Sequence, residues 1–202
     1  MINQVRLWCL RHGESENIVT GASGALPSAS LTPRGRHQAA RAADALHNEA
    51  ITHVYSSTAQ RARETADVIA ARLGVELTIL PALAEVSIGS SEGATDPATR
   101  TRTAAVLHAW IVGQDLSQRV ADGENGHQVT ARVTSALTTM AAAHPGGTIA
   151  LVGHVASLTT GISALCGLGE KVWGTPLPPA VPFLVTWDGN TWRCPTWPRA
   201  PH

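Results

Sequence analysis

The sequence has no excess of charge of either sign. Its 202 residues include 15 Lys plus Arg and 15 Asp plus Glu, so the formal net charge at pH 7 is zero. Proteins that bind nucleic acid usually carry a broad basic face, and solvating tails carry runs of acids. Neither is indicated, so no nucleic-acid partner is expected. A site for an anion must therefore gather a few cations locally.

Cysteine is also scarce. Cys9, Cys166 and Cys194 stand far apart, without a Cys-x-x-Cys pair, and the histidines show no zinc-binding spacing. The carboxylates do not cluster as a magnesium or two-metal site would require. The sequence therefore predicts reduced cysteines, with Cys9 and Cys166 packed in the core. It implies no metal and no cofactor.

Long apolar runs are absent too. Residues 4–10 are too short for the apolar core of a signal peptide and lead directly into charged Arg11 and His12. No run approaches the length of about 20 residues that spans a bilayer. We therefore expect a soluble cytoplasmic protein that has no membrane partner.

The sequence does contain an alternation of strand and helix patterns. Short apolar runs predict strands at 5–10, 53–56, 75–80 and 148–152; helical spacing predicts helices at 33–50, 62–73, 97–112, 129–140 and 155–166; residues 183–187 and 191–194 predict a hairpin; and residues 13–30 form a polar Gly/Ser loop. Thr32 and Pro33 are a typical helix start, and Gly74 a typical stop. The alternation predicts one α/β domain over residues 1–202, a three-layer sandwich with a mainly parallel central sheet flanked by helices.

Residues suited to chemistry follow several of these strands. His12 comes just after the first strand, and His154 just after the most apolar one. Arg61 lies shortly after the second strand, and Glu85 follows the third. Because ligands of open α/β sheets bind at the carboxyl ends of the strands, we expect these side chains to share one pocket.

These residue types suit phosphoryl transfer. A neutral imidazole is a competent nucleophile, and a covalent intermediate divides a difficult step into two. Guanidinium groups bind phosphate oxygens in a bidentate manner, and helix N-termini add backbone donors. A carboxyl group can protonate the leaving oxygen and then activate water. Taken singly, each residue has a plainer interpretation: a lone histidine can be a structural hydrogen-bonding residue, and Arg61 can pair with Glu64 or Asp67 on a solvated helix.

Several ordered segments resemble the histidine phosphatase superfamily, which includes cofactor-dependent phosphoglycerate mutases. The matching segments are Cys9-Leu10-Arg11-His12-Gly13-Glu14-Ser15, Leu31-Thr32-Pro33-Arg34-Gly35 through Ala39, Ser56-Ser57 through Arg61 to Ala66, Leu83-Ala84-Glu85 with Gly89 and Glu92-Gly93, Gly123-Glu124 before Arg132, and Leu151-Val152-Gly153-His154. They span nearly the whole chain in the family's order. The resemblance implies a phosphoglycerate mutase-like fold.

The same resemblance implies roles for individual residues. His12 is implied as the nucleophile that becomes a phosphohistidine, and Glu85 as the general acid and base. Arg11, Arg61 and His154 are implied as the phosphate clamp. The residues implied to line the substrate site are Gly13, Asn17, Ser23, Gly24 and Val155.

The sequence departs from the family pattern at four places. Position 18 is Ile where the family often has Asn, so that Asn17 lies one place early. Val155 replaces a glycine and adds bulk. Ser157-Leu158-Thr159 replaces a segment with a cation, and a proline-rich stretch at 177–182 replaces a late Asn-x-Ser segment.

The resemblance leaves three functions to compare. We expect a metal-independent phosphomonoesterase that hydrolyses a small phosphorylated metabolite, because residues 95–122, the expected lid, lack the long insertion rich in Lys, Arg and Tyr that mutases use to exclude water. A phosphoglycerate mutase-type phosphotransferase and a non-catalytic phospho-ligand binder are the alternatives. Trp110 and Trp173 either pack the lid or contact substrate. The substrate stays open, and so does the assembly state, for which a homodimer is one alternative.

Overall fold

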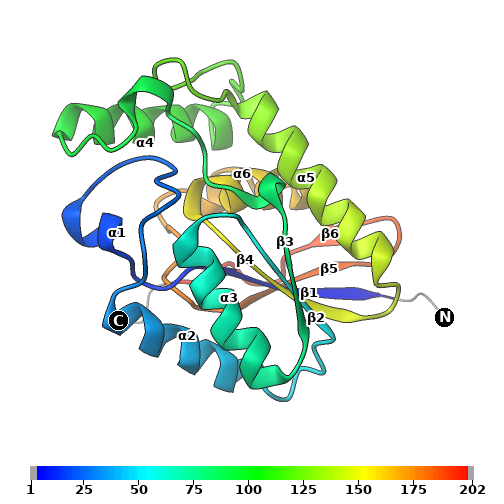
Figure 1. The fold of residues 1–202 in the computed structure, drawn as a ribbon. Helices are drawn as coiled ribbons and strands as arrows, with labels where there is room; N and C mark the ends of the chain where they lie inside the picture. Colours follow the sequence, from blue (N-terminus) through cyan, green and yellow to red (C-terminus); the bar gives the residue numbers. More distant parts are fainter. Residues whose placement is uncertain (1–3, 200–202) are drawn as a thin grey trace.

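The computed structural model describes residues 4–199 and consists of a six-stranded sheet between helices (Figure 1). The strands are β1 (Val5–Arg11), β2 (His53–Ser56), β3 (Glu76–Ile79), β4 (Thr148–Gly153), β5 (Phe183–Trp187) and β6 (Trp192–Arg193). The helices are α1 (Glu16–Thr20), α2 (Pro33–Leu46), α3 (Gln60–Leu73), α4 (Pro97–Ile111), α5 (Gly126–Ala143) and α6 (Val155–Cys166). Three short 3₁₀ turns, η1 (Pro81–Leu83), η2 (Gly89–Ser91) and η3 (Gly169–Val172), complete the described elements.

The strand order in the sheet is β3-β2-β4-β1-β5-β6. The pairs β1–β4, β2–β4 and β2–β3 are parallel, whereas β5 lies antiparallel to β1 and to β6. The predicted α/β fold with a mainly parallel sheet and a C-terminal hairpin is therefore confirmed. Strands β1 and β4 are central neighbours, so the residues that follow them, at positions 12 and 154, begin side by side.

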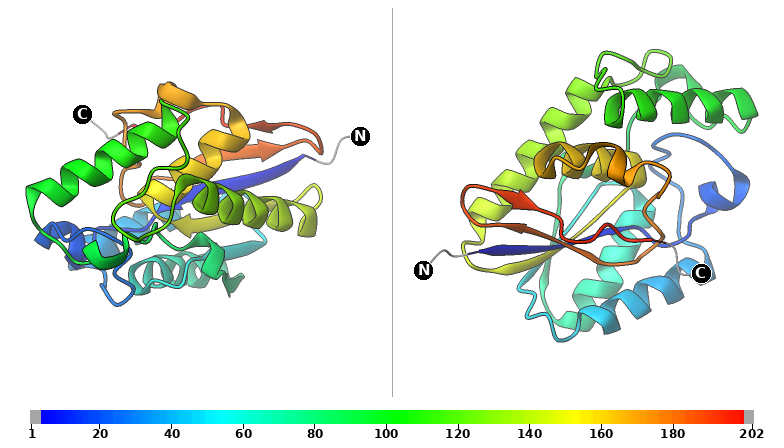
Figure 2. Two further views of the ribbon diagram at one scale, coloured as in Figure 1. Left: turned by 90° about the horizontal axis from the view of Figure 1, so that it is seen from above. Right: turned by 180° about the vertical axis from the view of Figure 1, so that it is seen from behind.

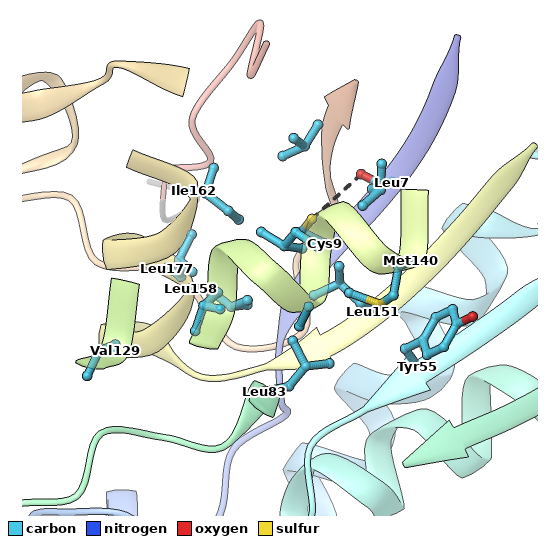
Figure 3. Close-up of a cluster of buried hydrophobic side chains, with 14 of the residues drawn as sticks. Leu7, Cys9, Tyr55, Leu83, Val129, Met140, Leu151, Leu158, Ile162 and Leu177 are labelled. Carbon is cyan, nitrogen blue, oxygen red and sulfur yellow. Dashed lines mark hydrogen bonds between the residues drawn. The ribbon is translucent and has the colours of Figure 1, made fainter. Parts of the chain in front are cut away.

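Helices cover both faces of the sheet. Helices α2 and α3 pack on one face, and α5 and α6 on the other (Figures 1 and 2). The core beneath α2 and α3 is rich in alanine, which lets these helices approach closely. The core beneath α5 and α6 is larger and includes Leu7 and Cys9 of β1, Leu151 of β4, and Met140 (Figure 3). Alternate residues of β1 supply the two cores, as the period of a strand requires.

The helix boundaries follow local chemistry, with a few departures from the prediction. The Thr32 side chain accepts a hydrogen bond from the Gly35 amide, and Gly74 ends α3 at φ 69°, as expected. Helix α2 stops at Leu46 instead of near Ala50, because the backbone turns there and Ala50 has φ 51°.

One further expectation was wrong, and another was met only in part, since Cys166 packs against the larger core without being fully buried. The region expected to be a loop at 13–30 contains α1, a five-residue helix without buried residues that Gly21 ends at φ 70°. It has too few residues to show an apolar period, which is why the sequence pattern missed it. Cys166 is only partly buried, because it lies in the last turn of α6, whereas Cys9 is fully buried as predicted.

Gly13 and Gly35 bring two motif segments into direct contact. A Cβ atom at Gly35 would lie 2.0 Å from the Glu14 carbonyl oxygen, and one at Gly13 would lie 2.5 Å from the Gly35 carbonyl oxygen. Both neighbours are backbone atoms, so neither contact can relax by a rotamer change. Glycine at these two positions lets the start of α2 support the turn after β1.

We predict that Gly35→Ala lowers the free energy of unfolding by about 2–3 kcal/mol, because the added methyl group forces two backbone segments apart. Helix propensity alone would raise stability, by about 1 kcal/mol, since Gly35 lies within α2. Urea denaturation of the two proteins measures the difference. An unchanged or higher midpoint would show that the two segments are not tightly interlocked.

Among residues 4–199, no helix is both long and apolar enough to cross a membrane.

Candidate active site

His12 lies at the end of β1 and is almost completely buried, with 3% of its surface exposed. Its backbone amide donates to the Gly153 carbonyl, which fixes the turn against β4. Its Nδ1 is 2.6 Å from the Gly13 carbonyl oxygen. Because a carbonyl oxygen only accepts, the ring proton of neutral His12 is on Nδ1 and the lone pair is on Nε2. The Nε2 atom is therefore the nucleophilic atom that this turn presents.

Arg61 connects the two histidines. Its Nε–H donates to His12 Nε2 at 3.1 Å, and one of its terminal nitrogens lies 3.3 Å from His154 Nδ1. The same terminal nitrogen also donates to the Ala25 carbonyl oxygen, and the other terminal nitrogen donates to the Leu26 carbonyl oxygen, each at 2.7 Å. With 1% of its surface exposed, Arg61 does not have the solvated position of the plainer interpretation.

Arg61 forms no ion pair with Glu64 or Asp67, the two partners of that interpretation, among the described residues. Glu64 forms an ion pair with Arg36 and accepts from the Leu31 amide. The positive charge of Arg61 therefore stays within the site. A loop of residues 22–30, which Arg61 holds by two carbonyl oxygens, covers this charge.

His154 lies at the N-terminus of α6, and its ring is fully buried. The rings of His12 and His154 approach edge to face with centroids 5.1 Å apart. Because the guanidinium of Arg61 only donates, His154 Nδ1 accepts and the ring proton is on Nε2, which lies 2.6 Å from Ser57 Oγ. The Ser57 hydroxyl can accept from this ring or donate to it. His154 can therefore exchange tautomers and offer Nδ1–H to an anion.

Arg11 adds a second cation at the same edge of the sheet. One of its terminal nitrogens donates to the Leu177 carbonyl at 3.1 Å, and its buried Nε–H has no hydrogen-bond partner among the described residues. Burial lowers the pKa of Arg11, the negative charge of Glu85 opposes this shift, and Arg61 adds to it. A buried, unsatisfied donor beside a second guanidinium is the arrangement that an anion would complete.

Glu85 sits in the segment after η1, against the N-terminus of α6. Its carboxylate accepts from the amides of Ala156 at 3.1 Å and Ser157 at 2.9 Å, and also from the amide of Val86 at 2.9 Å. The helix N-terminus stabilises this negative charge. Glu85 raises the pKa of both Arg11 and Arg61, so its charge acts on the two cations.

Two residues outside the predicted site position Glu85. Arg132 of α5 donates to the carbonyl oxygens of Ala82 and Ala84, each at 2.8 Å, and forms an ion pair with Glu124 at 2.7 Å. Glu124 and Arg132 both belong to a segment that matches the family motifs, but their spacing in the sequence did not show which backbone atoms they contact. The pair fixes the backbone that presents Glu85.

Sequence analysis also did not identify Thr65 and Glu92 as residues that hold backbone segments of the site in place. Thr65 Oγ1 accepts from the Gly13 amide at 3.1 Å and donates to the Arg61 carbonyl at 2.8 Å. The Glu92 carboxylate accepts from the amides of Ala25 at 2.7 Å and Ile88 at 2.8 Å. Both belong to matched motifs, which was the available signal. Their partners are backbone amides, which no sequence pattern identifies.

The residues expected to line the substrate site differ in the groups that they contact. The Gly13 amide is held by Thr65, and the Asn17 side-chain oxygen accepts from the Ser15 hydroxyl at 2.7 Å. Ser23 pairs through its backbone with residues 93–94, and Gly24 packs against Glu92 and Ile88. Val155 is the first residue of α6, directly after His154. The structure therefore brings together Arg11, His12, Arg61, Glu85 and His154, while Asn17 and Ser23 are engaged in local contacts.

The pKa values of both histidines lie well below the usual range, chiefly because burial disfavours the charged ring. For His12, the nearby charges of Arg61 and Arg11 add to this effect, and for His154 the largest further contribution comes from His12. Both rings are therefore neutral at pH 7. A neutral His12 keeps its Nε2 lone pair available.

This burial predicts how stability depends on pH. The unfolded chain binds protons at histidine near pH 6.5, whereas the folded chain does not, so the unfolded state binds more protons below that pH. We expect the free energy of unfolding to be constant near pH 7.5 and to fall by about 1 kcal/mol per buried histidine for each unit below 6.5. Urea denaturation at pH 7.5, 6.5 and 5.5 measures the slope. The exposed His47 provides the control, since His47→Ala should keep the slope, and a flat profile would contradict neutral buried rings.

The two tryptophans of the expected lid differ in environment. Trp110 of α4 is 4% exposed, and its ring N–H donates to the Gln118 carbonyl at 2.9 Å. Trp173 is 38% exposed and meets the His108 ring with centroids 4.8 Å apart. Trp110 therefore packs α4 onto the segment that follows it.

Comparisons with known proteins agree with this geometry. The family model of the histidine phosphatase superfamily (branch 1) matches residues 7–199. A phosphoglycerate mutase-like protein 4 of Arabidopsis thaliana is 30% identical over 100% of this chain and 88% of its own length. A probable phosphoglycerate mutase GpmB of Citrobacter koseri is 29% identical over 81% of this chain and 76% of its own length.

The fold also matches solved structures. The mycobacterial glucosyl-3-phosphoglycerate phosphatase Rv2419c in complex with VO3 superposes with a TM-score of 0.80, at 25% identity, over 96% of this chain and 99% of that one. The predicted resemblance to a phosphoglycerate mutase-like fold is thus confirmed.

Proposed function

The chain belongs to branch 1 of the histidine phosphatase superfamily, and we propose that it is a phosphomonoesterase that carries the phosphoryl group on His12. The observation that carries this proposal is the hydrogen bond from Arg61 Nε–H to His12 Nε2 at 3.1 Å. It shows that the Nε2 lone pair of a neutral imidazole points directly at a buried guanidinium. A phosphate oxygen bound by that guanidinium would bring phosphorus next to the nucleophile.

The first half of the reaction forms a phosphohistidine. His12 Nε2 attacks phosphorus, and the bond between phosphorus and the ester oxygen breaks. The proton of the Glu85 carboxylic acid passes to that oxygen, and the alcohol leaves.

The second half returns the enzyme to its starting state. The Glu85 carboxylate takes a proton from water, the hydroxide attacks phosphorus, and the bond between phosphorus and Nε2 breaks. Inorganic phosphate leaves and His12 is again neutral. Arg11, Arg61 and His154 would neutralise or bind the phosphoryl oxygens in both halves, which stabilises the charge that develops there.

The proposed mechanism uses arginines where other phosphatases use metal ions. Among residues 4–199, no group of three or more His, Cys, Asp and Glu side chains could hold a metal ion. Arg61, which is buried, and Arg11, which is partly buried, instead bring two positive charges to the phosphate site. We therefore propose that hydrolysis proceeds without a divalent cation.

A phosphoglycerate mutase activity is the second candidate, because one similar protein is named a probable phosphoglycerate mutase and another is named phosphoglycerate mutase-like. Such an enzyme must hold the phosphoryl group until a bound sugar acid takes it, and needs cations for the acid's carboxylate. Arg102 of α4 instead donates to the Arg119 carbonyl at 3.0 Å, and Arg100 is bound to the Thr95 carbonyl. These local bonds favour hydrolysis.

The test is a competition between hydrolysis and isomerisation. Purified protein is incubated with 3-phosphoglycerate or p-nitrophenyl phosphate in the presence of EDTA, and inorganic phosphate and 2-phosphoglycerate are both quantified. We expect phosphate release from p-nitrophenyl phosphate to continue in EDTA and to be inhibited by vanadate, with no isomerisation faster than release. Isomerisation that outpaces phosphate release would instead establish the mutase. A strict Mg²⁺ requirement would contradict the mechanism.

A further inference from the structure

A cavity of about 90 Å³ lies beneath α4, on the side of Glu85. Its walls come from α4, from the segment after η1, from the residues before α5, and from the loop at residue 24. Most are apolar, and the lining residues are Gly24, Glu85, Val86, Ile88, Thr103, Val106, Leu107, Trp110, Val120, Glu124 and Ala156. Since a water molecule requires roughly 10–15 Å³ of such space, the cavity has room for roughly six heavy atoms.

The cavity adjoins the phosphate site through three of its lining residues. Glu85 lines it and is the proposed proton donor to the leaving oxygen. The Ala156 amide donates to the Glu85 carboxylate, two residues after His154. Gly24 precedes Ala25, whose carbonyl oxygen binds Arg61. An alcohol whose oxygen takes the proton from Glu85 would therefore have this cavity beside it.

No cation lines the cavity among the described residues. Its two charged lining residues, Glu85 and Glu124, are both acids. The Glu124 carboxylate is already satisfied by Arg132 and by the Ser87 amide at 3.0 Å. A carboxylate or a second phosphate placed here would lose water without gaining a cation.

We infer that the leaving group of the substrate is an uncharged, largely apolar alcohol of about six heavy atoms, and that esters of sugar acids are poor substrates. The inference rests on the proposed function, because it takes Glu85 as the acid that protonates this alcohol. The apolar walls supply affinity by removing carbon surface from water. The absence of a lining cation supplies discrimination against anionic leaving groups.

Benzyl phosphate and 3-phosphoglycerate form a suitable pair of probes. Both leave as primary alcohols, so their intrinsic reactivity is similar, but one alcohol is an apolar ring and the other carries a carboxylate. We expect kcat/KM for benzyl phosphate to exceed that for 3-phosphoglycerate by about 100-fold, a contrast of the size that pocket contacts produce. A ratio near one, or one that favours 3-phosphoglycerate, would overturn the inference.

Two variants in the cavity wall sharpen the test. Leu107 and Thr103 are both partly exposed, so their replacement need not disturb the core. Leu107→Ala should lower kcat/KM for benzyl phosphate about tenfold and change that for glycerol 3-phosphate much less. Thr103→Arg should move the ratio toward 3-phosphoglycerate by about tenfold, because it places a cation in the wall. Ala105→Arg, exposed on the same helix and outside the cavity lining, is the matched control and should leave the ratio unchanged.

The outcomes separate this inference from the proposed function. If no ester is hydrolysed in a His12-dependent manner, the proposed function fails. If His12-dependent hydrolysis is seen but Leu107→Ala and Thr103→Arg behave like Ala105→Arg, only the leaving-group inference fails. Circular dichroism and urea denaturation of each variant establish that the comparison is made between folded proteins.

Discussion

The His12→Ala protein is expected to lose phosphatase activity by a factor of at least about 10⁴ in kcat, because the proposed covalent intermediate forms on this side chain. The ring is 3% exposed, and its Nε2 is held by Arg61 at 3.1 Å, so a solvent molecule cannot easily substitute for it. Steady-state hydrolysis of p-nitrophenyl phosphate measures the loss. The exposed His47 supplies a matched control, and His47→Ala should retain full activity.

The covalent intermediate gives a second readout of the same prediction. Rapid acid-free quenching during turnover should trap a phosphoryl group on His12 that is labile to acid and stable to base, and His12→Ala should trap none. Equal turnover by the wild-type and His12→Ala proteins would leave a non-catalytic phospho-ligand binder as the better description. An intermediate located on another residue would contradict the nucleophile assigned here.

The second large effect concerns Glu85, and it should depend on the leaving group. We expect Glu85→Gln to lower kcat/KM for benzyl phosphate by about 10²–10⁴-fold, since an alkoxide leaves poorly without a proton, and for p-nitrophenyl phosphate by less than about tenfold, since nitrophenolate leaves unaided. The parameter kcat/KM is chosen because it reports the steps up to release of the alcohol. A glutamine has the same shape and keeps one oxygen that can accept from an α6 amide, and circular dichroism checks that the variant is folded.

Glu76 offers a control for this substitution, because it is an exposed acid of β3. Glu76→Gln should leave both esters unaffected. If Glu85→Gln slowed the two esters equally, the carboxyl group would be positioning the site and not donating a proton. If it slowed neither, another acid would have to be sought.

Arg61 links the two histidines to the loop of residues 22–30. Its guanidinium holds two carbonyl oxygens of the loop at residues 25–26 and also contacts both histidines. A phosphate oxygen that binds Arg61 would have to compete with these partners. The loop that Glu92 also anchors is therefore a part of the site that substrate binding is expected to rearrange.

The sequence determined the elements of this protein and the identity of its central residues. Apolar runs bounded by glycine and polar turns specify buried strands, because only an extended segment can bury such short runs on both sides. Thr32 and Gly74 specify helix ends through local hydrogen bonds and backbone freedom. His12 and His154 were recognisable because ligands of α/β sheets bind at the carboxyl ends of the strands, where both residues stand. The ordered motifs indicated the family.

Only the tertiary structure decided which side-chain atoms are in contact and which tautomers the two histidines adopt. The Nδ1–H tautomer of His12 depends on a carbonyl oxygen 2.6 Å away, and the contact of Arg61 with both rings depends on the packing of α3 beside β4. The contact of Glu85 with the α6 amides joins residues 71 and 72 positions apart. Such long-range contacts, and the apolar cavity beneath α4, arise from the three-dimensional arrangement of backbone segments, which a one-dimensional pattern does not encode.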